Sequence, residues 1–290
     1  MNTYKFGVAL VIIGAVFWAS SGVMAESLFR KDYEVEWVSF YRLLLTGIIL
    51  SIFSFKKSRM QIFKDKAEFL SLALFGFFGL LMTQYSYFKA IDYLDAGTAT
   101  MIQYSAPIFI MLILCVKERV FPKKFDVLAL ILLVVAMFLL AFKGDFSLAK
   151  FNFWGICWAI LSAFGVVWYS LGARKIIVKY GVVFVMAYAS LIGALALFFC
   201  LEFKIPLKEF DLSGYIIMFG IVLIGTIGAF CLYLKGLEII GAIKASMIAC
   251  LEPVVAALMT CLLLGTVYTY LDIIAFCMII FSVYLNSKSK

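Results

Sequence analysis

Residues 87–107, YFKAIDYLDAGTATMIQYSAP, align without a gap to residues 233–253, YLKGLEIIGAIKASMIACLEP, at an offset of 146 positions. Tyrosine, lysine, an acidic residue, alanine, a Met-Ile pair and proline recur in step, and the register continues to Asp126 against Asp272. Self-similarity at a fixed offset indicates two copies of one structural unit. We therefore expect the chain to consist of two repeats, residues 1–146 and residues 147–290.

The composition suits a chain that is solvated by lipid. Of its 290 residues, 66% are apolar and only 14% are charged, and the mean hydropathy is +1.10. The charged residues lie in short islands between apolar runs of about 20 residues, the length that crosses a bilayer. This pattern predicts an all-α, polytopic membrane protein with ten transmembrane helices. They are expected near residues 6–29, 34–55, 67–89, 94–115, 124–142, 152–173, 182–201, 212–235, 240–264 and 267–285.

Basic residues are distributed unevenly between the two sides of these helices. Of the 25 Lys and Arg residues, 17 lie at the termini and in alternate loops, and only 7 lie in the opposite loops. The positive-inside rule then places both termini in the cytoplasm of a multi-pass plasma-membrane protein. Because five helices per repeat is an odd number, the second repeat enters the membrane from the other side, which gives an inverted repeat.

The N-terminal segment resembles a signal peptide, since Lys5 precedes an apolar run and the small-residue sequence Val23-Met24-Ala25. The apolar run is too long for a signal core. The segment also has a counterpart at mid-chain, because Phe6-Gly7 matches Trp154-Gly155 at a nearly equal offset. We therefore expect it to be the first transmembrane helix.

Composition also excludes several kinds of chemistry. The seven cysteines fall singly inside apolar runs and the chain has no histidine, so disulfides, zinc sites and histidine-dependent catalysis are not expected. The net charge of +8 comes from short loops without a basic face, which argues against a nucleic-acid partner. No Walker motif is present. We expect no cofactor, no metal and no enzymatic activity.

The aligned segments resemble the drug/metabolite transporter superfamily, in its ten-helix EamA-type branch. The best match is residues 87–141, which contain helix 4, the Glu118-Arg119 loop and helix 5, and LEPVVAALMTCLLLG at residues 251–265 is its echo. Trp18 and the segment FYRLLLTG around Arg42 also fit. The resemblance implies movement of small metabolites, amino acids among them, without an ATPase domain. The chain departs from it at Leu264-Gly265, where the second half lacks the acid that Glu118 supplies in the first.

Pro107 and Pro253 occupy equivalent positions within the predicted helices 4 and 9. Each proline removes a backbone hydrogen bond and frees the carbonyl four residues earlier, which belongs to Gln103 or Ala249. Freed carbonyls at membrane depth require a polar partner or a water-filled cavity, so a matched pair of helix interruptions is typical of a transport site. The alternative for each proline alone is a packing kink.

Glu252 immediately precedes Pro253 and is expected near the bilayer centre, facing inward because a carboxylate in lipid is costly. One interpretation is a carboxylate that couples transport to protons or binds a cation, and the other is a hydrogen bond to a neighbouring helix. Its repeat mate is Ala106, so this feature is not symmetric.

Other polar and aromatic side chains near the expected midplane are candidates for the wall of a solute cavity. Because aromatic residues make up 17% of the chain, each ring has the alternative of facing lipid or another helix. The candidates, beside Glu252, are Trp18, Gln84, Tyr85, Gln103, Tyr104, Trp168 and Tyr188.

Three basic residues lie within or at the ends of apolar runs. Lys89 and Lys235 are repeat mates near opposite membrane surfaces, where they are interfacial side chains or gate residues. Arg42 lies about two turns inside helix 2, and we interpret it as an interfacial anchor or a member of a structural ion pair.

These observations favour a secondary transporter that moves a small metabolite by alternating access, coupled to a proton or another gradient or working as an exchanger. Its partners are the solute, the lipid bilayer and a coupling ion, in a monomer or a homodimer. An intramembrane enzyme is the rival, but it needs a nucleophile or an acid/base pair at membrane depth. A channel or structural subunit is a second rival, although a channel would favour rings of like residues from identical subunits.

Overall fold

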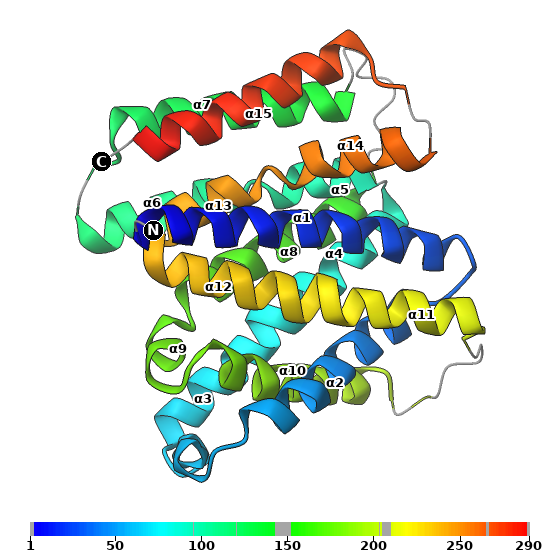
Figure 1. Ribbon diagram of the computed structural model, residues 1–290, viewed down its shortest axis with the longest axis vertical. Helices are drawn as coiled ribbons and strands as arrows, with labels where there is room; N and C mark the ends of the chain where they lie inside the picture. Colours follow the sequence, from blue (N-terminus) through cyan, green and yellow to red (C-terminus); the bar gives the residue numbers. More distant parts are fainter. Residues whose placement is uncertain are drawn as a thin grey trace.

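The computed structural model describes residues 3–94, 96–119, 121–142, 152–202, 204, 210–264 and 267–288, and these residues form helices joined by short connections (Figure 1). The helices are α1 (Thr3–Phe29), α2 (Val35–Ser54), α3 (Lys66–Leu74), α4 (Met82–Tyr93), α5 (Ala96–Gln103), α6 (Ala106–Glu118), α7 (Lys124–Phe142), α8 (Phe153–Leu171), α9 (Arg174–Tyr180), α10 (Val182–Cys200), α11 (Leu212–Gly220), α12 (Ala229–Ile240), α13 (Ala242–Ala249), α14 (Glu252–Leu264) and α15 (Tyr270–Lys288).

Length and hydropathy make this a polytopic membrane protein. Within the described part of the chain, seven helical stretches are long and apolar enough to cross a bilayer. Many large apolar side chains of α7 and α11 face outward, as in Leu128 and Ile216, which is expected where the surroundings are lipid. Two short elements lie outside the expected helices, a 3-10 helix at Lys57–Phe63 and α9.

Two of the long helices contain a π-helical stretch. Phe75–Leu81 joins α3 to α4, and Ile221–Gly228 joins α11 to α12, so the two stretches begin 146 positions apart. Each has a glycine where another helix approaches closely: a Cβ at Gly76 would lie 2.5 Å from the carbonyl oxygen of Ala189 in α10. These glycines allow close contact between helices at the centre of the protein.

The two predicted helices that contain Pro107 and Pro253 are each broken in two. The first is interrupted at Tyr104 and Ser105, between α5 and α6, and the second at Cys250 and Leu251, between α13 and α14. Each proline lies in the first turn of the second piece, where its missing N–H has no intrahelical partner to lose. The helices expected at 94–115 and 240–264 therefore each consist of two pieces that meet just before the proline.

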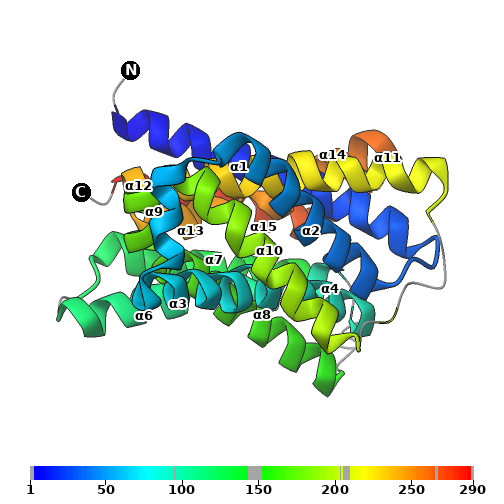
Figure 2. The same cartoon turned by 90° about the horizontal axis from the view of Figure 1, so that it is seen from below.

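The helices pack in pairs from distant parts of the sequence. α1 lies against α12, α4 against α8, and α2 against α10, and Figures 1 and 2 both show α2 and α10 crossing one side of the bundle. α7 and α15 form a pair at the opposite side (Figure 1). The start of α1 and the end of α15 lie at the same end of the bundle, which we call the near end. The far end is where α1 finishes and α11 begins.

Candidate functional site

A cavity lies between the two halves of the chain, next to both helix breaks. Its lining side chains come from α1, α2, α4, α5, α6, α8, α12, α13 and α14. One wall is aromatic, because the ring of Trp18 lies 5.1 Å from that of Phe230 and 5.0 Å from that of Tyr233. The polar lining is supplied by Ser21, Arg42, Thr83, Gln84, Tyr87, Gln103, Tyr104, Ser246 and Glu252.

Five of the side chains that the sequence nominated for a cavity line this one, namely Trp18, Gln84, Gln103, Tyr104 and Glu252. They come from four helices, α1, α4, α5 and α14, and from the break after α5 that contains Tyr104. The arrangement therefore places an aromatic ring, two amides, a phenol and a carboxylate around one space.

The other three nominated side chains lie elsewhere, which corrects the expectation for them. Tyr85 points away from the cavity, with its ring against Trp158 and its hydroxyl 3.4 Å from Glu36. Trp168 is 39% exposed on the outer face of α8. Tyr188 packs with Phe63 at the α10 surface. Tyr85 directly follows Gln84, so its depth along the helix is right and its direction around the helix is wrong.

The freed carbonyl of Ala249 has a polar partner, as expected for a proline-broken helix. The hydroxyl of Tyr104 donates to the Ala249 oxygen at 3.3 Å and to Oε2 of Glu252 at 2.5 Å. A residue at the first break thus bonds two groups at the second. Pro107 itself lines the cavity, whereas Pro253 does not.

Arg42 lies in the cavity wall and is only 5% exposed, so the expectation of an interfacial anchor is wrong. Its Nε donates to Oγ1 of Thr226 at 2.6 Å and its Nη2 donates to the Gly225 carbonyl at 3.0 Å. Its guanidinium also lies over the Phe88 ring, 5.4 Å from the centroid. These bonds attach α2 to the π-helical stretch between α11 and α12. Among the described residues, no carboxylate pairs with Arg42 within 4.0 Å.

Further polar residues connect the wall to neighbouring helices. Nε2 of Gln103 donates to Ser162 at 2.6 Å, and the Ser162 hydroxyl donates to the Thr83 carbonyl at 2.9 Å. Gln84 differs from these neighbours, because it is 4% exposed and neither of its side-chain polar atoms has a partner among the described residues. Buried amides without partners are uncommon in folded proteins, so the position of Gln84 requires an explanation.

Among the lining tyrosines that sequence reasoning missed, Tyr87 and Tyr233 are repeat mates. They are the first residues of the two aligned segments, 146 positions apart, so the repeat itself held the signal. Their recurrence could have been interpreted as symmetric placement toward a central space. The hydroxyl of Tyr87 bonds to that of Thr100 at 2.6 Å.

Lys89 and Lys235 lie away from the cavity and form ion pairs. Nζ of Lys89 lies 2.5 Å from Oε1 of Glu36, and both side chains are largely buried, at 20% and 24% exposure. Lys235 pairs with Glu238 one turn later at 2.7 Å, and its side chain is 53% exposed. The Lys89 pair connects α4 to α2, whereas the Lys235 pair lies within α12.

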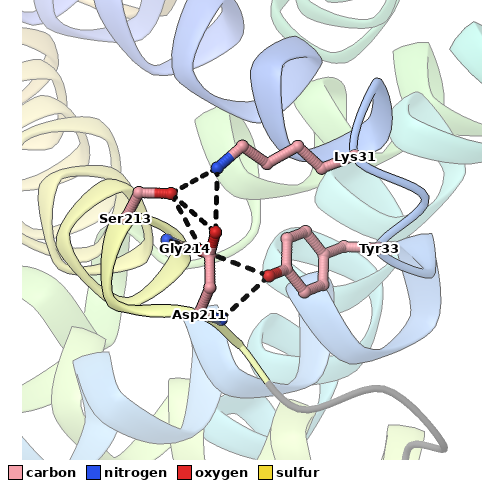
Figure 3. A network of polar contacts seen from close by, with 5 residues as sticks. All are labelled: Lys31, Tyr33, Asp211, Ser213 and Gly214. Carbon is pink, nitrogen blue, oxygen red and sulfur yellow. Dashed lines mark hydrogen bonds and ion pairs between the residues drawn. The ribbon is translucent and has the colours of Figure 1, made fainter.

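A polar network connects the end of α1 to the start of α11 at the far end of the bundle (Figure 3). Lys31 and Tyr33, which follow α1, bond to the carboxylate of Asp211 at 3.2 and 3.3 Å. Asp211 is the N-cap of α11, and its carboxylate also accepts a hydrogen bond from the Gly214 amide. That bond, the Ser213 hydroxyl and Lys31 lower the pKa of Asp211 to about 2. We call this group the Asp211 latch.

A second network lies at the near end, where α9 meets the start of α3. The carboxylate of Glu68 accepts hydrogen bonds from Lys179 and from the Tyr180 hydroxyl. The bond to Glu68 raises the pKa of Lys179. We call these three residues the Glu68 latch. Asp65, which lies 146 positions before Asp211, caps α3 separately through the amides of Ala67 and Glu68.

No metal site is evident in the described ranges, because they contain no group of three or more acidic or cysteine side chains. The cavity offers hydrogen-bonding and charged groups but no coordination sphere. Its chemistry is that of recognition: a cation, a carboxylate, two amides and aromatic faces.

Comparison with known proteins gives matches along the whole chain. The model of the EamA-like transporter family matches residues 5–142 and again residues 153–288. A Salmonella typhimurium protein named "Uncharacterized inner membrane transporter YicL" is 33% identical over 294 residues, which cover 99% of this chain and 97% of that protein. "Uncharacterized transporter YcbK" of Bacillus subtilis is 22% identical and covers 89% of this chain and 85% of its own.

A solved crystal structure has a similar fold. It matches with a TM-score of 0.76 and covers 97% of this chain and 96% of its own, although only 14% of the residues are identical. At this level of identity the likeness concerns the fold alone.

Proposed function

Since the chain belongs to the EamA-like transporter family, we propose that it is a secondary transporter which carries a small zwitterionic metabolite, such as an amino acid, across the inner membrane by alternating access. The names of its relatives support a membrane transporter, because both are called transporters and one an inner membrane transporter.

The proposed architecture is ten transmembrane helices in two inverted five-helix repeats, with both termini in the cytoplasm. Helix boundaries support it: α5 and α13 begin 146 positions apart, as do α6 and α14, and α7 and α15. The family model also matches the two halves separately. In such folds the solute site lies near the bilayer midplane between the repeats, next to discontinuous helices.

One observation carries the choice of solute: Arg42 and Glu252 line the same cavity and are not paired with each other. Within the described residues, Nη1 of Arg42 and Oε1 of Glu252 have no hydrogen-bond partner. A buried cation and a half-buried carboxylate with open positions suit a solute that supplies the opposite charges. A zwitterion offers a carboxylate to Arg42 and an ammonium group to Glu252.

Coupling to protons is assigned to Glu252. It is the carboxylate that lines the cavity, and the Tyr104 hydroxyl occupies only one of its two oxygens. A carboxylate at membrane depth that binds and releases a proton during the cycle would make transport depend on pH.

The test is counterflow into liposomes that contain the purified protein and a high internal concentration of unlabelled amino acid. Saturable uptake of external labelled amino acid, faster with the internal amino acid than without it, is expected for a carrier. Glu252→Gln should remove the pH dependence of uptake driven by a proton gradient. Uptake that does not saturate, or that internal amino acid never stimulates, would contradict a carrier and favour a channel.

A further inference from the structure

Gln84 has no structural partner in a region where neighbouring polar groups have theirs. Thr83 donates to a backbone carbonyl of its own helix, and Gln103, Ser162 and Tyr87 all have hydrogen-bond partners. By contrast, Nε2 and Oε1 of Gln84 are both buried and both unpartnered in the described structure, although the residue lines the cavity. A buried amide left in this condition destabilises the protein, so its retention has to be explained.

The helix frame does not require an amide at this place. At the corresponding position 146 residues later, the other half has Phe230, which lines the same cavity and packs edge-on against Trp18. An apolar ring therefore fits the equivalent position of a closely similar helix. Gln84 therefore adds a polar amide to one wall of the cavity that the helix packing does not require, whereas the wall around Phe230 is aromatic.

The open positions of Gln84 define the group that satisfies them. An amide presents donor hydrogens on nitrogen and an acceptor oxygen side by side. A carboxylate only accepts and an ammonium group only donates, so neither uses both atoms of Gln84. A carboxamide uses both, because its own N–H and C=O form two parallel hydrogen bonds with those of Gln84.

We propose that Gln84 is a specificity-determining residue and that the preferred solute is a zwitterion whose side chain ends in a carboxamide. The inference rests on the proposed function, since Arg42 and Glu252 receive the charged groups. Gln84 then recognises the neutral end of the solute. A solute of equal length that lacks the amide would bury Gln84 without partners and be rejected.

The experiment uses the full chain in liposomes with L-glutamine and L-methionine as labelled solutes, since the two have side chains of similar length and only the first has an amide. Wild-type protein should favour L-glutamine by at least about tenfold in uptake efficiency, the ratio expected from two lost hydrogen bonds. Gln84→Met should abolish that preference. Gln61→Met is the matched control, because Gln61 is exposed in the 3-10 helix Lys57–Phe63, and it should keep the wild-type ratio.

A second measurement does not depend on transport. Replacing an unpartnered buried amide with an apolar side chain of similar size removes a cost, so Gln84→Met should raise the melting temperature of the purified protein without ligand. A lower melting temperature would mean that Gln84 has a structural partner, such as a fixed water, and would overturn the inference.

The outcomes separate the inference from the proposed function. If wild-type protein carries amino acids but does not distinguish L-glutamine from L-methionine, the role of Gln84 is refuted and the carrier stands. If no amino acid shows counterflow, the zwitterion carrier falls as well. Uridine is a further probe, because its base has a similar donor–acceptor edge but it carries no charge. If uridine alone is carried and Gln84→Met abolishes its uptake, the role of Gln84 stands and the proposal of a zwitterionic solute is overturned.

Discussion

The two halves of the chain, residues 5–142 and 153–288, share a backbone plan and differ in the side chains that they bring to the cavity. Both halves contain a π-helical stretch and a helix broken one or two residues before a proline-containing turn. The breaks place one residue of each half in contact, because Tyr104 bonds to Glu252. The shared backbone forms the cavity, and the side chains that differ between the halves determine what the cavity can bind.

The differences are concentrated in the polar wall. Glu252 corresponds to Ala106, so the carboxylate belongs to the second half. Arg42 lies in α2, which puts the cation in the first half. Oppositely charged groups thus reach one cavity from different halves. Two repeats with a similar backbone can therefore form one site that contains both charges, although neither repeat supplies both.

The largest effect should come from removing the carboxylate that only one half possesses. Glu252→Ala should lower amino-acid uptake by about 100-fold or more, because the ammonium group of the solute loses its counter-charge in the cavity. The measurement is initial uptake rate in liposomes at equal protein content. Glu238→Ala removes instead the half-buried acid of the Lys235 pair, which lies away from the cavity, and should change uptake little. Equal losses in both variants would show that the cavity carboxylate has no special role.

The next effect concerns the cation of the first half. Arg42→Met should destabilise the protein by about 1–3 kcal/mol, since Thr226 and the Gly225 carbonyl lose their partner at membrane depth. Thermal unfolding in detergent, followed by tryptophan fluorescence, measures the change. Arg42→Lys keeps the charge but not the two-pronged geometry, and should fall between wild type and Arg42→Met. A melting temperature unchanged in Arg42→Met would contradict the attachment of α2 to the π-helical stretch.

An effect of similar size distinguishes the two π-helical stretches. At Gly225 a Cβ would lie 2.0 Å from Oγ and 2.2 Å from Cβ of Ser21, across the contact with α1. At its mate Gly79 the nearest atom is 2.8 Å away and belongs to the Phe75 ring on the same helix. Gly225→Ala should therefore cost about 1–3 kcal/mol through overpacking, and Gly79→Ala less. The same unfolding assay compares them, and the reverse order would show that α1 is free to move aside.

The smallest effects should come from the latches at the two ends, which respond to opposite extremes of pH. The pKa of Asp211 is depressed to about 2, so its contribution is complete above the ordinary aspartate pKa of about 3.9 and is lost as pH falls toward 2. The pKa of Lys179 is raised, so its contribution is complete below the ordinary lysine pKa of about 10.4 and is lost as pH rises beyond it.

Melting curves over pH measure both contributions. Asp211→Asn and Lys179→Met should each lower the melting temperature by a few degrees at neutral pH, and by less than Arg42→Met, because these groups are exposed. The deficit of Asp211→Asn should vanish at acidic pH and that of Lys179→Met at alkaline pH. Deficits that do not depend on pH would refute the ionic part of the latches.

The broken helices and part of the cavity could be predicted because they depend on residues whose position along the sequence is informative by itself. Pro107 and Pro253 recur at a fixed offset, and a proline within an apolar run removes a backbone bond wherever it lies. Residues close to them in sequence, such as Gln103, Tyr104 and Glu252, therefore lie near the break in space as well. Depth along the helix was sufficient to nominate these three.

The sequence does not show which face of each helix points toward the cavity. Tyr85 follows Gln84 directly, and the 100° turn between successive residues places one in the cavity and the other against Trp158. With apolar residues on every face, the period that orients a helix in a soluble protein is absent. Arg42 was misjudged for a related reason, since its partner is a carbonyl in a π-helical stretch that sequence does not reveal.

The central claim is that Arg42 and Glu252 bind the two charges of one solute. It is tested most directly by comparing the amino acid that best stabilises the purified protein in a thermal-shift screen with its methyl ester and its N-acetyl derivative. Each derivative lacks one charge, so each should bind at least about tenfold more weakly than the parent, by titration calorimetry. Equal affinity for the parent and both derivatives would contradict the claim.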